Sequence, residues 1–172
     1  SGPILYIPIA VPGSGKTTLA ELLVNAGLIG GGNVISPDQL REKVVGDISS
    51  QDKNHLVFEA TYALLRLSLA SGRDTYLDAT NASQKVIRAV LKKIVEHFDY
   101  RAEDFEIILI PCGVSTELAK SRSERRERKV PEYVIDRMAK SIKAINFEKI
   151  LEEFQHLNIS IEDDEERIWM EA

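Results

Sequence analysis

Apolar residues along the chain alternate between short continuous runs and longer stripes with helical spacing. The short runs cover residues 4–9, 34–36, 75–77 and 105–110. Apolar runs of this length predict buried strands. Stripes with three- and four-residue spacing predict helices at 16–26, 37–44, 54–70 and 83–98, and two more after Pro131. Residues 115–128 predict a further helix with a basic end.

Strands that alternate with helices predict an α/β fold, with a parallel sheet of four or five strands and helices on both faces. The last strand is expected in the tail between Leu157 and Trp169. We expect a single domain over residues 1–172, with a helical arginine-rich lid at about 115–140 and a C-terminal helix and tail at about 146–172. Ligands bind at the carboxyl ends of strands in such sheets, so residues that follow strands are the first site candidates.

Two of the helical stripes predict which side chains pack on the sheet. Helix 54–70 should bury the apolar residues Leu56, Val57, Ala60, Ala63, Leu64, Leu67 and Leu69. The next helix should follow the N-cap Ser83 and bury Val86, Ile87, Val90, Leu91, Ile94 and Phe98. Ser36 and Pro37 predict the start of helix 37–44, as N-cap and first-turn proline.

A glycine-rich segment joins the first strand to the first helix. It consists of Pro12, Gly13, Ser14, Gly15, Lys16, Thr17 and Thr18, and its context is that of a Walker A phosphate-binding loop. Its glycines allow backbone N–H groups to surround an anion at the helix N-terminus. Lys16 should reach the β- and γ-phosphates and Thr17 should coordinate Mg²⁺, although Ala10 stands where the motif usually begins with glycine. The sequence therefore predicts a P-loop phosphotransferase fold that binds ATP or another nucleoside triphosphate.

Asp38 and Arg41 follow the second predicted strand, beside the phosphate loop in this topology. A carboxylate there can take the proton of an attacking hydroxyl group, whereas the alternative is an acid that only stabilises the helix dipole. Arg41 lies three residues later on the same helix face, where its guanidinium suits a phosphate on the acceptor. The alternative for Arg41 is a solvated surface arginine.

Asp78 follows the third strand, at the position of a Walker B carboxylate that holds the water shell of the metal. The alternative is a turn in which Thr80 and Asn81 cap the next helix. The basic segment from Lys120 to Lys129 includes Arg122 and Arg125, and it predicts a mobile lid whose arginines stabilise transition-state charge. A surface helix whose arginines are compensated by neighbouring glutamates remains the alternative.

Composition limits the class of partner. The 172 residues carry a net charge of −5, so no global basic field is available to coat a nucleic acid. The single Cys112 excludes an intramolecular disulfide and fits a reducing compartment. Neither a transmembrane run nor a signal peptide is evident, and the expected location is the cytoplasm without a membrane partner.

Several of these pieces, in this order, resemble the 5′-hydroxyl polynucleotide kinases of phage and bacterial end-repair systems. The matching motifs are the phosphate loop 12–17, Ser36-Pro37-Asp38-Gln39-Leu40-Arg41, Gly46-Asp47 with Gln51, Asp78-Ala79-Thr80-Asn81, and the arginine-rich segment that leads to Val130-Pro131. The Ser-x-Asp-x-x-Arg motif and the lid are more discriminating than the loop, which many kinases share. The resemblance spans residues 4 to about 140.

The resemblance implies a role for each matched residue. Lys16 and Thr17 would bind phosphates and Mg²⁺, Asp38 would be the general base on the 5′-OH, and Arg41 would hold the neighbouring 3′-phosphate with Gln51 on the acceptor side. Arg125 fits the essential lid arginine best and Arg122 second, because the sequence around Arg122 is shifted by one residue from the family pattern. Family members self-associate, which makes a homo-oligomer compatible with the resemblance.

Three functions are compatible with these residues. The leading hypothesis is ATP- and Mg²⁺-dependent phosphorylation of the 5′-OH of RNA or DNA at a short single-stranded terminus, as in nucleic-acid repair. The second is a P-loop kinase of a small metabolite such as a nucleotide sugar, similar to zeta-type toxins. The third is a nucleotide-hydrolysing switch module, against which Asp38, Arg41 and the lid count.

Overall fold

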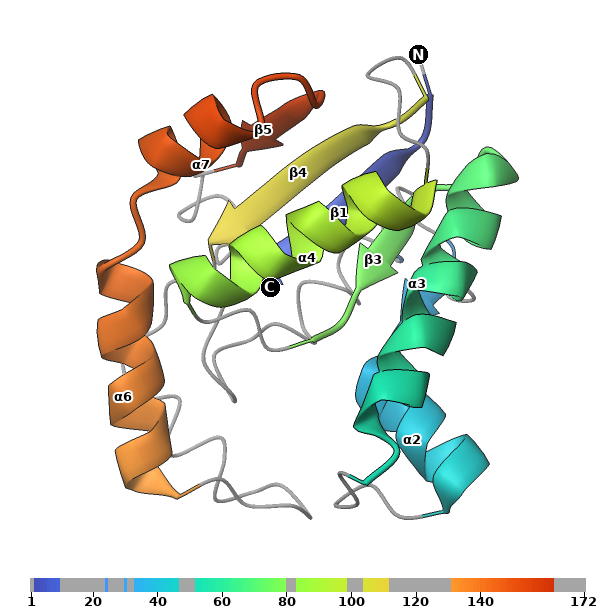
Figure 1. Cartoon of the computed structure of the whole chain (residues 1–172), viewed down its shortest axis with the longest axis horizontal. Coiled ribbons are helices and arrows are strands. Elements are labelled where there is room, and N and C mark those ends of the chain that lie inside the picture. The colour runs from blue at the N-terminus through green and yellow to red at the C-terminus, as the bar shows by residue number, and fades with distance from the viewer. Residues whose placement is uncertain are drawn as a thin grey trace.

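The computed structural model describes residues 2–9, 24, 30, 33–46, 52–79, 83–98, 104–111 and 131–162. Five parallel strands form one sheet in the order β2-β3-β1-β4-β5 (Figure 1). The strands are β1 (Ile4–Ile9), β2 (Val34–Ile35), β3 (Thr75–Leu77), β4 (Glu106–Pro111) and β5 (Ile159–Ile161). The predicted parallel α/β sheet is confirmed, and its last strand lies in the tail as expected.

Helices connect and follow these strands. The described helices are α2 (Pro37–Val45), α3 (Asn54–Ala70), α4 (Gln84–Phe98), α6 (Glu132–Lys143) and α7 (Phe147–Glu153). Helix α2 begins as predicted, because the Ser36 hydroxyl oxygen accepts a hydrogen bond from the Gln39 N–H and Pro37 occupies the first turn. It ends at Gly46, whose φ of 87° is a left-handed conformation that glycine adopts without steric cost.

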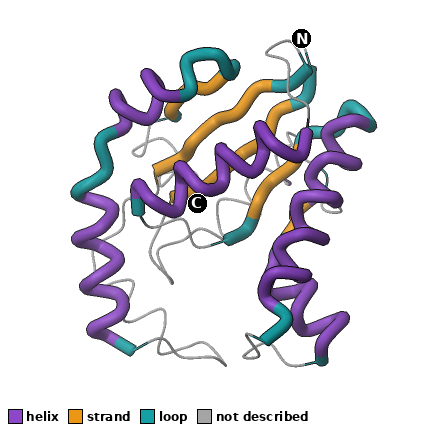
Figure 2. The backbone as a smooth tube through the Cα atoms, viewed as in Figure 1, coloured by secondary structure: helices purple, strands orange, loops and turns teal. Residues whose placement is uncertain are grey.

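The main core lies between one face of the sheet and helices α3, α4 and α7 (Figure 2). Alternate residues of β1, namely Leu5, Ile7 and Ile9, face this core. Tyr6 and Tyr76, which are paired across β1 and β3, point to the opposite face and are also buried. Both faces of the central strands are therefore shielded from water, as parallel sheets require.

Helix α3 corrects one sequence expectation. Five of the seven residues that were expected to pack on the sheet are exposed, namely Leu56, Ala60, Ala63, Leu64 and Leu67, and Leu67 is 64% accessible. Val57 and Leu69 are buried as expected, and the rest of the buried stripe consists of Thr61, Tyr62 and Leu65. The helix contains leucines on several faces, so counting apolar residues did not identify the face; the four-residue spacing of the buried set would have. In α4 the predicted stripe is buried except for Val86, which is 40% accessible.

Polar contacts join α4 to α7 at the surface. The Arg88 guanidinium donates two hydrogen bonds to the Glu153 carboxylate, from Nε at 2.7 Å and from Nη2 at 3.0 Å. The Asn146 N–H, at the start of α7, donates to the side-chain oxygen of Gln84. These contacts fix α7 against the helix that covers the sheet centre. Within the described ranges, no helix has both the length and the apolar character needed to cross a bilayer.

Candidate functional site

The predicted phosphate loop follows the central strand of the sheet. Strand β1 lies between β3 and β4, and the chain leaves its carboxyl end at Ile9 to enter the glycine-rich sequence. Central strands of parallel sheets open onto the ligand-binding edge at their carboxyl ends. The loop residues Pro12 to Thr18 themselves lie outside the described residues.

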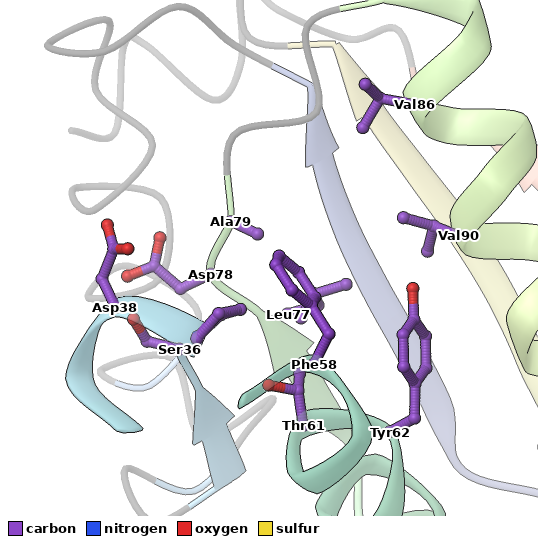
Figure 3. A pocket seen from close by; sticks show the side chains of 11 residues that line it. Ser36, Asp38, Phe58, Thr61, Tyr62, Leu77, Asp78, Ala79, Val86 and Val90 are labelled. Atoms are coloured by element: carbon purple, nitrogen blue, oxygen red, sulfur yellow. The ribbon is translucent and has the colours of Figure 1, made fainter. Parts of the chain in front are cut away.

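Asp38 and Asp78 lie at neighbouring strand ends. Ile35 of β2 pairs with Leu77 of β3, Asp78 follows Leu77 directly, and Asp38 is the second residue of α2. The Asp78 N–H donates a 2.8 Å hydrogen bond to the Ile35 carbonyl oxygen, which extends the pairing to the site edge. Both carboxylates line one pocket of about 260 Å³ and lie on the same side of it (Figure 3).

Arg41 contacts Asp38 from within the protein. Its Nη1 donates to Asp38 Oδ1 at 2.6 Å, and its Nη2 donates to the side-chain oxygen of Asn54, at the start of α3. The Arg41 side chain is only 4% accessible, whereas that of Asp38 is 59% accessible. Among the described residues, the buried Arg41 Nε has no hydrogen-bond partner. Arg41 is therefore not a solvated surface arginine, and it links the Asp38 carboxylate to α3.

This arrangement orients Asp38. A carboxylate bound on one oxygen by a buried guanidinium has fewer accessible rotamers, and its other oxygen remains available at the pocket. Asn54 is a site residue that sequence reasoning missed. Its separation from Arg41 by thirteen positions and an intervening polar stretch offered no local signal, apart from its place at the start of a predicted helix.

An apolar wall faces the two carboxylates across the pocket. We use this name for Phe58 and Tyr62 of α3, Leu77 of β3, and Val86 and Val90 of α4. Figure 3 shows the Tyr62 hydroxyl pointing toward the α4 valines, and burial raises the pKa of Tyr62 to about 12. The Tyr62 hydroxyl group is therefore protonated at neutral pH, as that of an unperturbed tyrosine also is.

Residues 7–145 match the family described as an AAA domain. The match spans well over half of the sequence. The chain belongs to the AAA domain family. No curated protein sequence matches it.

Solved structures share the fold of this AAA domain. A chain in the Pnkp1/Rnl/Hen1 RNA repair complex is 19% identical, with a TM-score of 0.67 over 83% of this chain and 44% of that chain. A fungal RNA kinase is 18% identical, with a TM-score of 0.62 over 94% of this chain and 38% of that one. A sugar kinase from Janibacter sp. HTCC2649 is 15% identical, with a TM-score of 0.58 over 98% and 90%. The AAA domain spans less than half the length of the first two.

These comparisons establish a P-loop kinase fold. The family model identifies an AAA domain, and the likeness to the solved structures concerns the fold. The similar structures include a chain of an RNA repair complex, a fungal RNA kinase and a sugar kinase, so the acceptor has to be inferred from the site itself.

The acidic residues of the described site fit a magnesium ion held largely by phosphates and water. No group of three or more His, Cys, Asp or Glu in the described part of the AAA domain has the arrangement of a metal cage. Mg²⁺ bound with a nucleotide needs only one or two protein oxygens beside the phosphates. Asp78 lines the pocket and would supply one carboxylate of this type, and Thr17 is predicted to supply a hydroxyl group.

The remaining predicted site residues lie outside the described part of the chain. They are the loop residues from Pro12 to Thr18, which include Lys16, together with Gln51, Arg122 and Arg125. Their roles remain predictions. The part that is described brings together Asp38, Arg41 and Asp78, all within one edge of the sheet.

Proposed function

We propose that this AAA domain transfers the γ-phosphoryl group of ATP to the 5′-OH end of RNA or DNA. The acceptor O5′ attacks the γ-phosphorus as its proton passes to the Asp38 carboxylate. An O5′–P bond forms, the bond from the γ-phosphorus to the β–γ bridging oxygen breaks, and ADP leaves with that oxygen. The products are a 5′-phosphorylated end and ADP.

The observation that carries this proposal is the accessible Asp38 carboxylate beside Asp78 in one pocket. A general base must reach the acceptor hydroxyl group and must be held in position. Two observations support Asp38 in this role: it is exposed at the pocket, and buried Arg41 holds one of its carboxylate oxygens. An acid that served only the helix dipole would need no such partner.

Other groups complete the proposed site. Lys16 and Thr17 would hold the donor phosphates and Mg²⁺, which supplies positive charge that offsets the charge of the phosphates. Arg125, with Arg122 as the second candidate, would contact the donor phosphates from the lid. Gln51 would contact the acceptor. The net charge of −5 supports a site that holds only a strand end, because few phosphates would be neutralised.

Arg41 has a narrower proposed role than a free phosphate ligand. Both of its terminal nitrogens already donate to side-chain oxygens, and its side chain is almost fully buried. Contact with the 3′-phosphate of the acceptor would therefore share these nitrogens with Asp38 or Asn54. We propose that Arg41 first positions Asp38, and that its contact with the acceptor phosphate is secondary.

Phosphorylation of a small metabolite is the second candidate. The observation in its favour is that the likeness to the sugar kinase covers nearly all of both chains, whereas the chain of the RNA repair complex and the fungal RNA kinase extend far beyond this domain. A small-molecule kinase would use the same base and the same phosphate loop. It would differ in what the rest of the pocket recognises.

The test is transfer of label from γ-labelled ATP, with Mg²⁺, to a 5′-OH oligonucleotide. We expect 5′-labelled product from the wild type and a loss of about 10²- to 10⁴-fold in kcat for Asp38→Ala. Asp104→Ala is the matched control. Asp104 is exposed just before β4, at the amino-terminal ends of the strands, whereas Asp38 lies at their carboxyl ends. Label that reaches only water, or only a small metabolite such as a nucleotide sugar, would rule out the polynucleotide reaction.

A further inference from the structure

The apolar wall lies opposite the two carboxylates of the candidate site, and two of its side chains are open to the pocket. Three of its members, Tyr62, Leu77 and Val90, are almost fully buried and belong to the packed core. Phe58 and Val86 are 36% and 40% accessible, so an aromatic ring from α3 and an aliphatic side chain from α4 remain open to the pocket. Figure 3 shows the Phe58 ring on the same pocket as Asp38 and Asp78.

The hydroxyl groups near this wall are already engaged. Thr61 is 1% accessible and donates a 2.8 Å hydrogen bond to the Val57 carbonyl oxygen. The Ser36 hydroxyl oxygen accepts the N–H of Gln39 at the start of α2. Polar recognition in the pocket is therefore expected mainly at the two carboxylates, because Tyr62 is only 7% accessible.

This division of the pocket distinguishes two classes of acceptor. A sugar ring offers Phe58 only a small C–H face and carries hydroxyl groups around its rim, and those placed against Val86 would lose water without gaining a partner. A nucleobase presents flat π faces, which stack favourably on an aromatic side chain regardless of base identity. Its ribose 5′-OH must then lie toward the polar side of the pocket, where Asp38 is exposed.

We infer that the apolar wall binds the nucleobase of the acceptor's 5′-terminal nucleotide, with Phe58 as the stacking side chain. This inference rests on the proposed function and extends it to how the acceptor is selected. Stacking on a single ring favours any base over none, so the site distinguishes nucleotides from sugars without strong sequence preference. Phe58 is thus a specificity-determining residue that recognises the base of the 5′-terminal nucleotide of the strand.

The experiment compares two acceptors, a 5′-OH oligonucleotide and the same oligonucleotide with an abasic 5′-terminal residue. We expect the wild type to prefer the base-bearing end by about 5- to 150-fold in kcat/KM, mainly through KM. Phe58→Ala should remove most of this preference and leave the abasic acceptor unchanged. Phe58→Tyr, which keeps the ring, should retain the preference. Leu67→Ala is the matched control, an exposed apolar residue of the same helix outside this pocket.

Each outcome separates this inference from the proposed function. If the wild type phosphorylates both oligonucleotides equally, the wall does not hold the base, while the polynucleotide kinase reaction stands. If Phe58→Ala lowers kcat/KM equally for both acceptors, Phe58 is structural and the inference is wrong. If neither oligonucleotide is labelled but a sugar is, the proposed function itself fails.

Discussion

Two arginine–carboxylate pairs in this protein have nearly the same bond lengths and very different surroundings. Arg88 and Glu153 form a bidentate pair at 2.7 and 3.0 Å with side chains 39% and 35% accessible. Arg41 donates a single 2.6 Å bond to Asp38 from a buried position. In the exposed pair, both carboxylate oxygens of Glu153 accept a hydrogen bond from Arg88. The buried Arg41 guanidinium, in contrast, retains one nitrogen without a partner among the described residues.

The comparison shows that contact geometry alone does not indicate what an ion pair does. Water competes for the exposed pair, so Arg88 and Glu153 contribute modestly by holding α4 and α7 together. Burying the Arg41 guanidinium carries a desolvation cost that a well-packed apolar side chain would avoid. A buried cation beside a pocket carboxylate is therefore better explained by the position it imposes on Asp38 than by stability.

The largest predicted difference between the two ion pairs is in the free energy of unfolding that is lost when the carboxylate is removed. Asp38→Ala leaves the buried Arg41 guanidinium without its carboxylate, so we expect the free energy of unfolding to fall by about 1–3 kcal/mol. Asp38→Asn, which keeps an oxygen acceptor, should lose less. Glu153→Ala should change the urea midpoint less than Asp38→Ala, because Arg88 is rehydrated in the folded state. Equal midpoint shifts for the two alanine variants would contradict the distinction between the pairs.

Asn54 tests the positioning role without changing either charge. Asn54→Ala removes the acceptor of Arg41 Nη2 and should lower kcat by about 10-fold through misplacement of Asp38, with the KM for ATP unchanged. Asn54→Asp retains an oxygen acceptor and should restore most of the turnover. Steady-state kinetics on folded variants checks this result. A loss of stability with normal kcat would show that Asn54 only supports the fold.

The smallest predicted effect concerns pH and the exposed pair. Hydrogen bonds from Arg88 hold the pKa of Glu153 below its ordinary value of 4.5, and the same contact raises the pKa of Arg88. Because the folded pKa of Glu153 is lowered, its stabilising contribution is present above the unfolded pKa and disappears as pH falls through the folded pKa. The difference in Tm between wild type and Glu153→Gln should therefore shrink from pH 7 to pH 3. A difference that is constant over this range would mean that the contribution of Glu153 to stability does not depend on its charge.

The sequence predicted the positions of most elements because their signals are local. Helix 54–70 has the bounds expected from its apolar spacing, and Ser36 with Pro37 placed the start of α2. The shared edge of Asp38 and Asp78 was also predictable, since both follow strands and parallel strands end on the same side. These inferences needed only the order of elements.

Contacts between distant elements were not predictable in the same way. Arg41 was identified as a candidate, but its burial and its bond to Asn54 depend on how α2 packs on α3. Phe58 was not counted in any stripe, because its role arises where α3 and α4 approach each other over the end of β3. Spacing along one helix contains no information about the opposite wall of a pocket.

The strand order has a consequence for how the chain reaches this structure. β1 is the central strand, yet its partners β3 and β4 lie about 70 and about 100 residues later in the chain. At a synthesis rate of about 5–20 residues per second, the β4 partner emerges roughly 5–20 s after β1. Leu5, Ile7 and Ile9 remain without a sheet during that interval. Folding of this domain is thus expected to be non-local, because the central strand pairs only with segments that are synthesised much later.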